Sequence, residues 1–173
     1  MTAKPKLLAL PPPFEEAIRR HDREIMRFLI RVTSDREDAL DLFQETFLRA
    51  YRAYPQLDSE AGLRPWLFKI ASNLCRNRAR DRGRRSRVIS GESSAESLEG
   101  VATNSNHSNQ AGPDGAFDLR RAIAGLPGKQ GQAFVMRKIV GLEYSEIGAA
   151  LNCSEDSARA GVYQALRKLK ELR

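Results

Sequence analysis

The chain has 173 residues, of which 41% are hydrophobic and 7% aromatic, enough apolar material for one ordinary domain or two small ones. Its formal net charge of +7 at pH 7 favours a polyanionic partner. The two cysteines are far apart and have no second Cys or His at ligand spacing, which excludes a disulfide framework and a readable zinc site. We therefore expect a reduced, cytoplasmic protein with no metal ion and no cofactor.

The first 13 residues are expected to form an N-terminal tail. Residues 7–14 are apolar but are interrupted by three consecutive prolines. This run is too short to cross a bilayer and has no signal-peptide cleavage pattern. We expect no membrane insertion.

Residues 14–87 contain three segments with helical spacing of apolar residues. The first predicted helix spans about 14–29. The second is expected over 34–54, after a capping Ser or Asp and before a proline. The third is expected over 65–81, because its first residue is a proline, which suits the first turn of a helix. These helices predict a first domain.

Residues 88–115 contain no aromatic residue and are rich in Ser, Asn and Gly. Such a segment cannot bury enough apolar area to offset the entropy of ordering it, so it is predicted to be a flexible linker. It carries no basic and four acidic residues, a charge of −4. The linker separates a block of +7 over 1–87 (19 basic, 12 acidic) from a block of +4 over 116–173 (10 basic, 6 acidic).

Residues 116–173 are expected to form a second domain of helices broken at Pro-Gly, Gly and Asn-Cys. The four predicted helices span 116–126, 131–140, 143–151 and 154–172. The last two have the proportions of a helix-turn-helix, whose second helix enters the DNA major groove. The predicted fold class is therefore all-α, with two small helical domains joined by a flexible linker and a helix-turn-helix in the second.

Acidic side chains share one side of the second predicted helix, opposite its apolar stripe. Asp38, Asp41 and Glu45 are spaced three and four apart, and Gln44 is adjacent. This surface is either simply solvated or a docking surface for a basic helical partner.

The third predicted helix carries a polar ridge that continues into a run of arginines. Arginine occupies seven of the twelve positions 76–87, and Asp81 is the only acid there. Because a solvated surface normally mixes both signs, we expect nucleic-acid contact here, with the basic groups on phosphates and Asn73 suited to a base edge. At intervals of four, three and four, the ridge consists of Lys69, Asn73, Arg76 and Arg80.

Three segments together resemble one known family. They are DREDALDLFQETFLRAYRAYPQLD (35–58), PWLFKIASNLCRNRARDRGRR (65–85) and LPGKQGQAFVMRKIVGLEYSEIGAALNCSEDSARAGVYQALRKL (126–169). The chain resembles the extracytoplasmic-function sigma factors of bacterial RNA polymerase, which have two helical domains and a linker.

The resemblance implies three sets of binding residues. The residues that bind core polymerase would be Asp38, Asp41, Leu42, Gln44, Glu45 and Phe47. The residues that bind the −10 element, where a base is flipped from the non-template strand, would be Leu57, Arg64, Trp66, Lys69, Asn73, Arg76, Arg80 and Arg84. The residues that bind the −35 element would be Arg137, Ser157, Arg159, Ala160, Tyr163, Gln164 and Arg167.

Three positions depart from the family pattern. Leu57 replaces a usual aromatic, which implies poorer stacking on the flipped base. Glu155 and Asp156 stand in the turn before the recognition helix, where they suit a helix N-terminus but oppose a phosphate. Gly161 replaces a usually basic residue, which removes a DNA contact and lowers helix stability.

The resemblance implies a sigma factor that binds core RNA polymerase and promoter DNA and is controlled by an anti-sigma factor. An enzyme is not expected, because the sequence shows no nucleophile with its base, no phosphate loop and no metal cluster. The alternatives are a stand-alone helix-turn-helix regulator and an interaction protein that mainly binds a regulatory partner.

Overall fold

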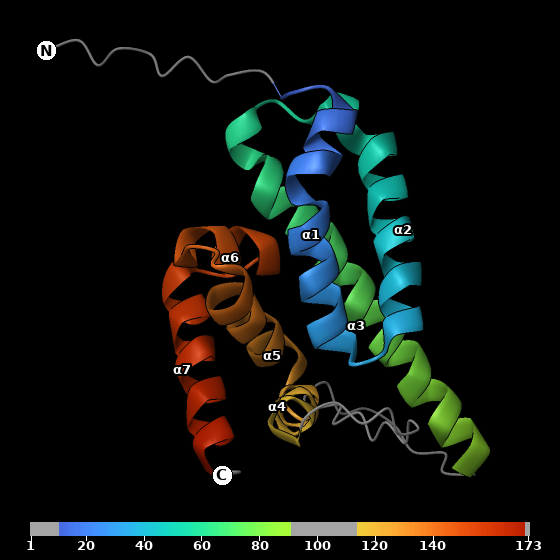
Figure 1. The fold of residues 1–173 in the computed structure, drawn as a ribbon, viewed down its shortest axis with the longest axis vertical. Helices are drawn as coiled ribbons and strands as arrows, with labels where there is room; N and C mark the ends of the chain where they lie inside the picture. The colour runs from blue at the N-terminus through green and yellow to red at the C-terminus, as the bar shows by residue number, and fades with distance from the viewer. Residues whose placement is uncertain (1–10, 91–113, 172–173) are drawn as a thin grey trace, which may run out of the picture.

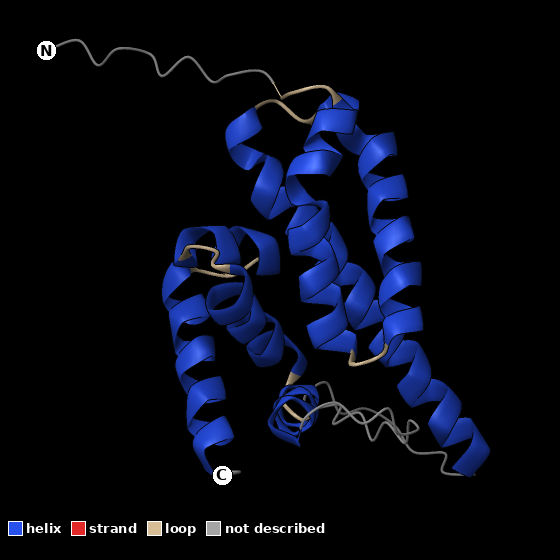
Figure 2. Cartoon of the chain, in the orientation of Figure 1, coloured by secondary structure: helices blue, strands red, loops and turns tan. Residues whose placement is uncertain are grey.

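The computed structural model describes residues 11–90 and 114–171, and all regular structure within these ranges is helical (Figure 2). None of the described helices is long and apolar enough to cross a membrane. The predicted all-α fold is confirmed. In chain order (Figure 1), the elements are α1 (Phe14–Thr33), α2 (Arg36–Ala53), the 3-10 turns η1 (Tyr54–Gln56) and η2 (Glu60–Gly62), α3 (Leu63–Ser90), α4 (Asp114–Ala124), α5 (Gly128–Val135), the π-turn η3 (Met136–Val140), α6 (Tyr144–Leu151) and α7 (Glu155–Glu171).

The α1–α2 connection is short because backbone groups at the end of α1 and the start of α2 find hydrogen-bond partners within the connection itself. Ser34 has a left-handed φ of 57° and donates its N–H to the Ile30 carbonyl at 3.1 Å, which ends α1. The Asp35 carboxylate then accepts the Asp38 N–H at 2.9 Å and caps α2, as its side chain and position predict. These two caps place α1 and α2 side by side (Figure 1).

Helices α1, α2 and α3 enclose one apolar core. Ile25, Phe28 and Leu29 from α1 are fully buried. The Phe28 ring meets that of Phe68 from α3 edge-on, with centroids 5.4 Å apart, a favourable aromatic geometry. Because one side of α3 packs into this core, the core determines which side of α3 faces away from it.

Helix α3 is longer than the sequence predicted at both ends. It begins at Leu63 rather than residue 65 and continues to Ser90 rather than ending near 81. Arginine is a good helix former, so the arginine-rich run extends the helix. The predicted linker is therefore wrong for residues 88–90 and 114–115, which are helical; residues 1–10 and 91–113 lie outside the described part of the chain.

The helix-turn-helix is formed by α6 and α7, whose buried side chains Ile147, Leu151 and Val162 face a common core. The helix before it begins at 128 rather than 131 and ends in the wider turn η3 at Gly141, whose φ is 89°. A Cβ on Gly148 would lie 2.8 Å from the Cys153 carbonyl oxygen. Glycine at 148 therefore allows the turn to close against α6.

The two groups of helices pack against each other, an arrangement that was not predicted from the sequence. Helix α3 contacts α6, and α1 contacts α4 and α5 (Figure 1). At the centre, the buried Ser72 hydroxyl donates to the Ala150 carbonyl at 3.4 Å, and Gln132 Nε2 donates to the Ser72 carbonyl at 3.2 Å.

Candidate nucleic-acid and protein interfaces

A surface groove lies between α2 and α3. Asp41 and Gln44 are exposed at its edge, and Leu48 is 45% exposed within it. Glu45 accepts from Arg49 at 2.6 Å, one turn along α2. The groove is lined by Asp41, Leu42, Gln44, Glu45, Leu48, Arg49, Leu74, Asn77, Arg78 and Asp81. It combines carboxylates with accessible apolar area.

Asp38 does not belong to this exposed acidic surface, contrary to the sequence prediction. Its side chain is only 12% exposed and lies against α3, where it forms ion pairs with Arg78 at 3.6 Å and with Arg82. Leu42 and Phe47 are also buried, the latter with its ring 4.8 Å from that of Phe43. These three side chains hold α2 in place rather than meeting solvent.

The predicted ridge on α3 is divided between solvent and the second domain. Lys69, Arg80 and Arg84 are exposed. Asn73 and Arg76 are half-buried and joined to each other by a hydrogen bond. Arg76 lines a small cavity whose other walls include Ile123, Leu126 and Gly131 of the second domain. The inner part of the ridge is therefore covered in this structure.

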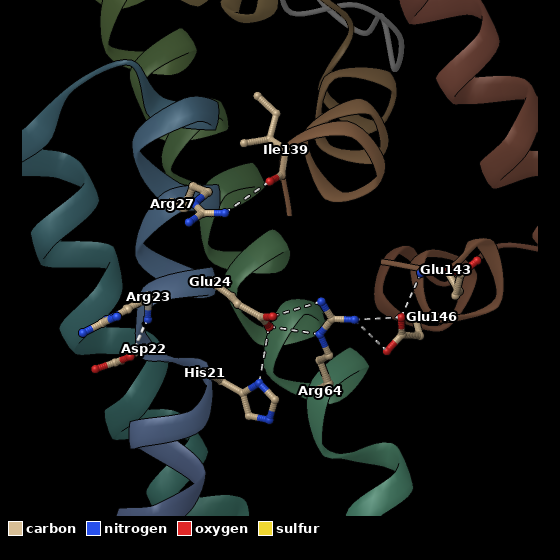
Figure 3. A network of polar contacts seen from close by, with 9 residues as sticks. All are labelled: His21, Asp22, Arg23, Glu24, Arg27, Arg64, Ile139, Glu143 and Glu146. Atoms are coloured by element: carbon tan, nitrogen blue, oxygen red, sulfur yellow. Dashed lines mark hydrogen bonds and ion pairs between the residues drawn. The ribbon is translucent and has the colours of Figure 1, made fainter. Parts of the chain in front are cut away.

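The start of α3 is held by an ion-pair network (Figure 3). Arg64 donates to both oxygens of Glu24 on α1 at 3.0 Å and to Glu146 on α6 at 3.0 Å. Burial raises the pKa of Glu24, but the hydrogen bonds from His21 and Arg64 outweigh it and bring that pKa down to about 2. The Glu24 hydrogen bond raises the pKa of Arg64.

Two other residues of the predicted −10 set lie in or beside the loop before α3. Leu57 is half-buried and packs against the apolar core. Trp66 is also half-buried, with its ring 6.3 Å from that of Tyr54. Neither side chain projects freely into solvent in this form of the molecule.

Helix α7 presents its predicted DNA-reading side to solvent, where Tyr163 is 68% exposed. Arg159 pairs with Glu155 at 2.8 Å and Asp156 at 3.1 Å. The two atypical carboxylates therefore offset the positive charge of a residue that was predicted to contact DNA. Gln164 accepts from Gln130 at 2.6 Å. Also exposed on this helix are Ser157, Ala160 and Arg167.

Arg137 is half-buried and belongs to a cluster that the sequence did not indicate. It pairs with Glu143 at 2.9 Å and donates to the Leu142 carbonyl at 2.8 Å. The guanidinium groups of Arg137 and Arg159 lie 4.7 and 5.0 Å from the Tyr144 ring centroid. Tyr144 thus connects η3 to the start of α7. This contact could not be predicted from the sequence, because it depends on how the helix-turn-helix packs.

Comparisons with known proteins assign the chain to a family. The family model for Sigma-70 region 2 matches residues 17–85, and that for Sigma-70, region 4 matches residues 116–169. The RNA polymerase sigma factor CarQ of Myxococcus xanthus is 32% identical over 164 residues, which cover 92% of this chain and 88% of that protein. The chain belongs to the extracytoplasmic-function sigma factors of the sigma-70 family.

A second relative is longer than this chain. The ECF RNA polymerase sigma factor SigE of Mycolicibacterium smegmatis is 31% identical over 165 residues. The match covers 94% of this chain but 62% of that protein.

Two solved structures share the fold across both domains. The sigma factor RpoE, in complex with the anti-sigma factor NepR from Bartonella quintana, matches with a TM-score of 0.72 and 25% identity over 92% of this chain and 95% of that chain. CnrH, in complex with the cytosolic domain of CnrY, matches with a TM-score of 0.65 over 92% and 86%. At 21% identity, the second likeness shows the fold alone.

Proposed function

We propose that this chain is a cytoplasmic, non-enzymatic sigma factor that joins core RNA polymerase to promoter DNA. The observation that carries the proposal is the groove between α2 and α3, which Asp41, Gln44 and Glu45 line together with the exposed Leu48. Carboxylates around an apolar strip suit a basic amphipathic helix, because the ion pairs orient it while its apolar side is buried. Of the residues predicted to bind polymerase, four line this groove: Asp41, Leu42, Gln44 and Glu45.

The basic side of α3 would hold the −10 strand. Lys69, Arg80 and Arg84 are free to approach phosphates, while Asn73 could read an unstacked base after the domains separate. Melting needs no catalytic residue, because capture of one strand shifts the duplex equilibrium by differential binding. The exposed side of α7 would read the −35 element, and each weak contact would strengthen the others within one chain.

An anti-sigma factor is the regulatory partner that we propose. RpoE and CnrH, which share this chain's fold, were solved in complex with NepR and with the cytosolic domain of CnrY. Such a partner would hold the sigma factor away from polymerase by covering the groove or by holding the two domains together.

A stand-alone DNA-binding regulator is the second candidate, and the exposure of Tyr163 and its neighbours on α7 favours it. It predicts tight, sequence-specific duplex binding by the isolated protein. The sigma-factor proposal predicts weak duplex binding until polymerase is present.

The polymerase surface is tested by reversing its charge. Asp41→Arg combined with Glu45→Arg should abolish co-purification with core polymerase, because both carboxylates would become repulsive to a basic partner. A matched control makes the same charge change outside the groove, with Glu15→Arg and Glu37→Arg, both exposed. Equal retention of polymerase by the two double variants would refute the assignment.

The −10 contact is tested by Asn73→Ala. We expect fewer open complexes per bound polymerase, measured by base reactivity to permanganate, with polymerase association unchanged. Asn77→Ala is the comparison, because Asn77 lies one turn along α3 and lines the α2–α3 groove instead: it should affect polymerase association and leave the number of open complexes per bound polymerase unchanged. A proportional loss of polymerase binding by Asn73→Ala would show that the residue is structural.

A further inference from the structure

The start of α7 carries an arginine that is held by two carboxylates and an aromatic ring. Arg159 Nη2 donates to Glu155 Oε1 at 2.8 Å, and its Nη1 donates to Asp156 Oδ1 at 3.1 Å. The guanidinium carbon of Arg159 lies 5.0 Å from the centroid of the Tyr144 ring. Tyr144 is itself half-buried and packs against the apolar core. We call these four residues the Arg159 clamp.

The two carboxylates of the clamp have no other polar partner in the described part of the chain. The Glu155 and Asp156 side chains are 51% and 92% exposed, and their only ion pairs there are those with Arg159. They are not needed to cap α7, because the Ser154 hydroxyl accepts the Ser157 N–H at 3.1 Å. Apart from a favourable charge at the helix N-terminus, their structural effect is to hold Arg159.

The charge of the clamp favours a base edge over a phosphate. One guanidinium group and two carboxylates leave a net charge of −1 on the first turns of α7, which opposes a phosphate. The major-groove edge of guanine instead offers two acceptors to an arginine. Two of the five N–H donors of Arg159 are used inside the clamp, so three remain for a base. The first residues of such a helix are those that contact base edges in a helix-turn-helix.

The clamp also orients Arg159 before DNA arrives. A free arginine side chain loses much rotamer freedom when it binds, whereas one that is already restrained loses less. Arg167, on the same helix, is held far less: its one ion pair, with Glu171, is 3.8 Å long, and its side chain is 64% exposed. The structure therefore distinguishes a restrained arginine from an unrestrained one on a single DNA-facing helix.

We propose that Glu155 and Asp156 are positioning residues that hold Arg159 for a guanine of the −35 element, at the expense of its attraction to phosphate. The two positions at which this chain departs from the family pattern thus sharpen the reading of one base. The proposal rests on the proposed function, because the −35 contact of α7 belongs to it.

The test uses polymerase holoenzyme reconstituted from the full-length chain and core polymerase, on promoters randomised over the −35 element. Transcripts from each promoter give the base preference at every position, and Arg159→Ala identifies the position whose guanine preference depends on Arg159. Glu155→Gln and Asp156→Asn then remove one charge each. Glu171→Gln is the matched control, since it removes the same charge from another Glu–Arg pair four residues apart on α7. Asp156→Glu keeps the charge and the three-residue spacing to Arg159.

We expect Glu155→Gln and Asp156→Asn each to lower the guanine preference at that position about twofold, the size expected for an exposed ion pair within a helix. Asp156→Glu and Glu171→Gln should leave it unchanged, and the preferences at the other positions should stay the same in all four variants. An unchanged preference in both carboxylate variants would overturn the proposal. So would an equal loss at every position, which indicates a merely structural role, or a library in which no position depends on Arg159.

Failure of the proposed function has a different signature. In that case the unsubstituted chain would itself give no promoter-specific transcripts with core polymerase, and both proposals would be overturned together. Specific transcripts with an unaltered guanine preference would overturn the positioning role alone.

Discussion

Asp38 and Asp41, three residues apart on α2, show how burial separates two identical side chains. Asp38 faces α3 with a 12% exposed side chain, whereas the Asp41 side chain is 68% exposed and lies 3.7 Å from Arg78. A carboxylate enclosed by guanidinium groups supports the packing of two helices, and one in solvent is available to a partner.

This difference predicts unequal effects on stability. Asp38→Asn should lower the free energy of unfolding by about 1 to 3 kcal/mol, because a shielded charge pair is broken. Asp41→Asn should change it by less than about 0.5 kcal/mol. Urea unfolding of the two variants checks this, and equal losses would contradict the assigned roles.

Glu24 predicts a pH dependence of stability. Its pKa lies at about 2 in the folded chain against an ordinary 4.5, so its contribution is complete above pH 4.5 and is lost as the pH falls toward 2. The stability difference between the unsubstituted protein and Glu24→Gln should therefore be constant from pH 7 to 5.5 and shrink below 4.5. Denaturant unfolding across this range measures it; a difference that grew on acidification would show that the carboxylate is not stabilised by Arg64.

The residues that form an exposed surface could be predicted only where the spacing of residues within a single helix determines it. The spacing of Asp41, Gln44 and Glu45 places them on one side of α2 without further knowledge. The burial of Asp38 depends on Arg78 and Arg82, about 40 residues further on, facing the first turn of α2. No local pattern contains that information.

At the scale of elements, α6 and α7 depend on two glycines with opposite surroundings. A Cβ at Gly148 would meet the Cys153 carbonyl oxygen at 2.8 Å, in the turn of the helix-turn-helix. A Cβ at Gly161 would meet only the Ala133 Cβ at 3.9 Å, an ordinary contact.

The two alanine substitutions should therefore have opposite signs. Gly148→Ala should destabilise the chain by about 1 to 3 kcal/mol, because the turn must move away. Gly161→Ala should stabilise α7 by up to about 1 kcal/mol through helix propensity. Thermal unfolding followed by circular dichroism compares them, and a loss of stability in both would mean that α7 packs more tightly around Gly161 than the structure indicates.

Helix number and type were predictable because apolar spacing, caps and Pro or Gly breaks agree for each helix. The ends of α3 were predicted too short. Pro65 was taken as the first helical residue, although the helix begins at Leu63, and the arginine run after residue 81 has a helix propensity that carries the helix on to Ser90. The start of α5 at Gly128 rather than 131 reflects its position directly after Pro127, which leads into the helix.

At the scale of the whole molecule, the packing of the second domain on α3 could not be predicted. Arg64 pairs with Glu24 and Glu146, which lie 40 and 82 positions away in the sequence. In the sequence, each of these three residues looks like an ordinary surface charge. If the two groups of helices bind separate DNA elements, as we propose, they must also separate, and nothing in the sequence indicates which of the two arrangements predominates.

The most direct test of the central claim, that this chain directs polymerase to promoters, is transcription in vitro with core polymerase and a library of promoter sequences. We predict that specific start sites appear only when the chain is added, that the selected promoters share two sequence elements at a fixed spacing, and that Asn73→Ala removes the response without releasing the chain from polymerase. Identical transcripts with and without the chain would contradict the account.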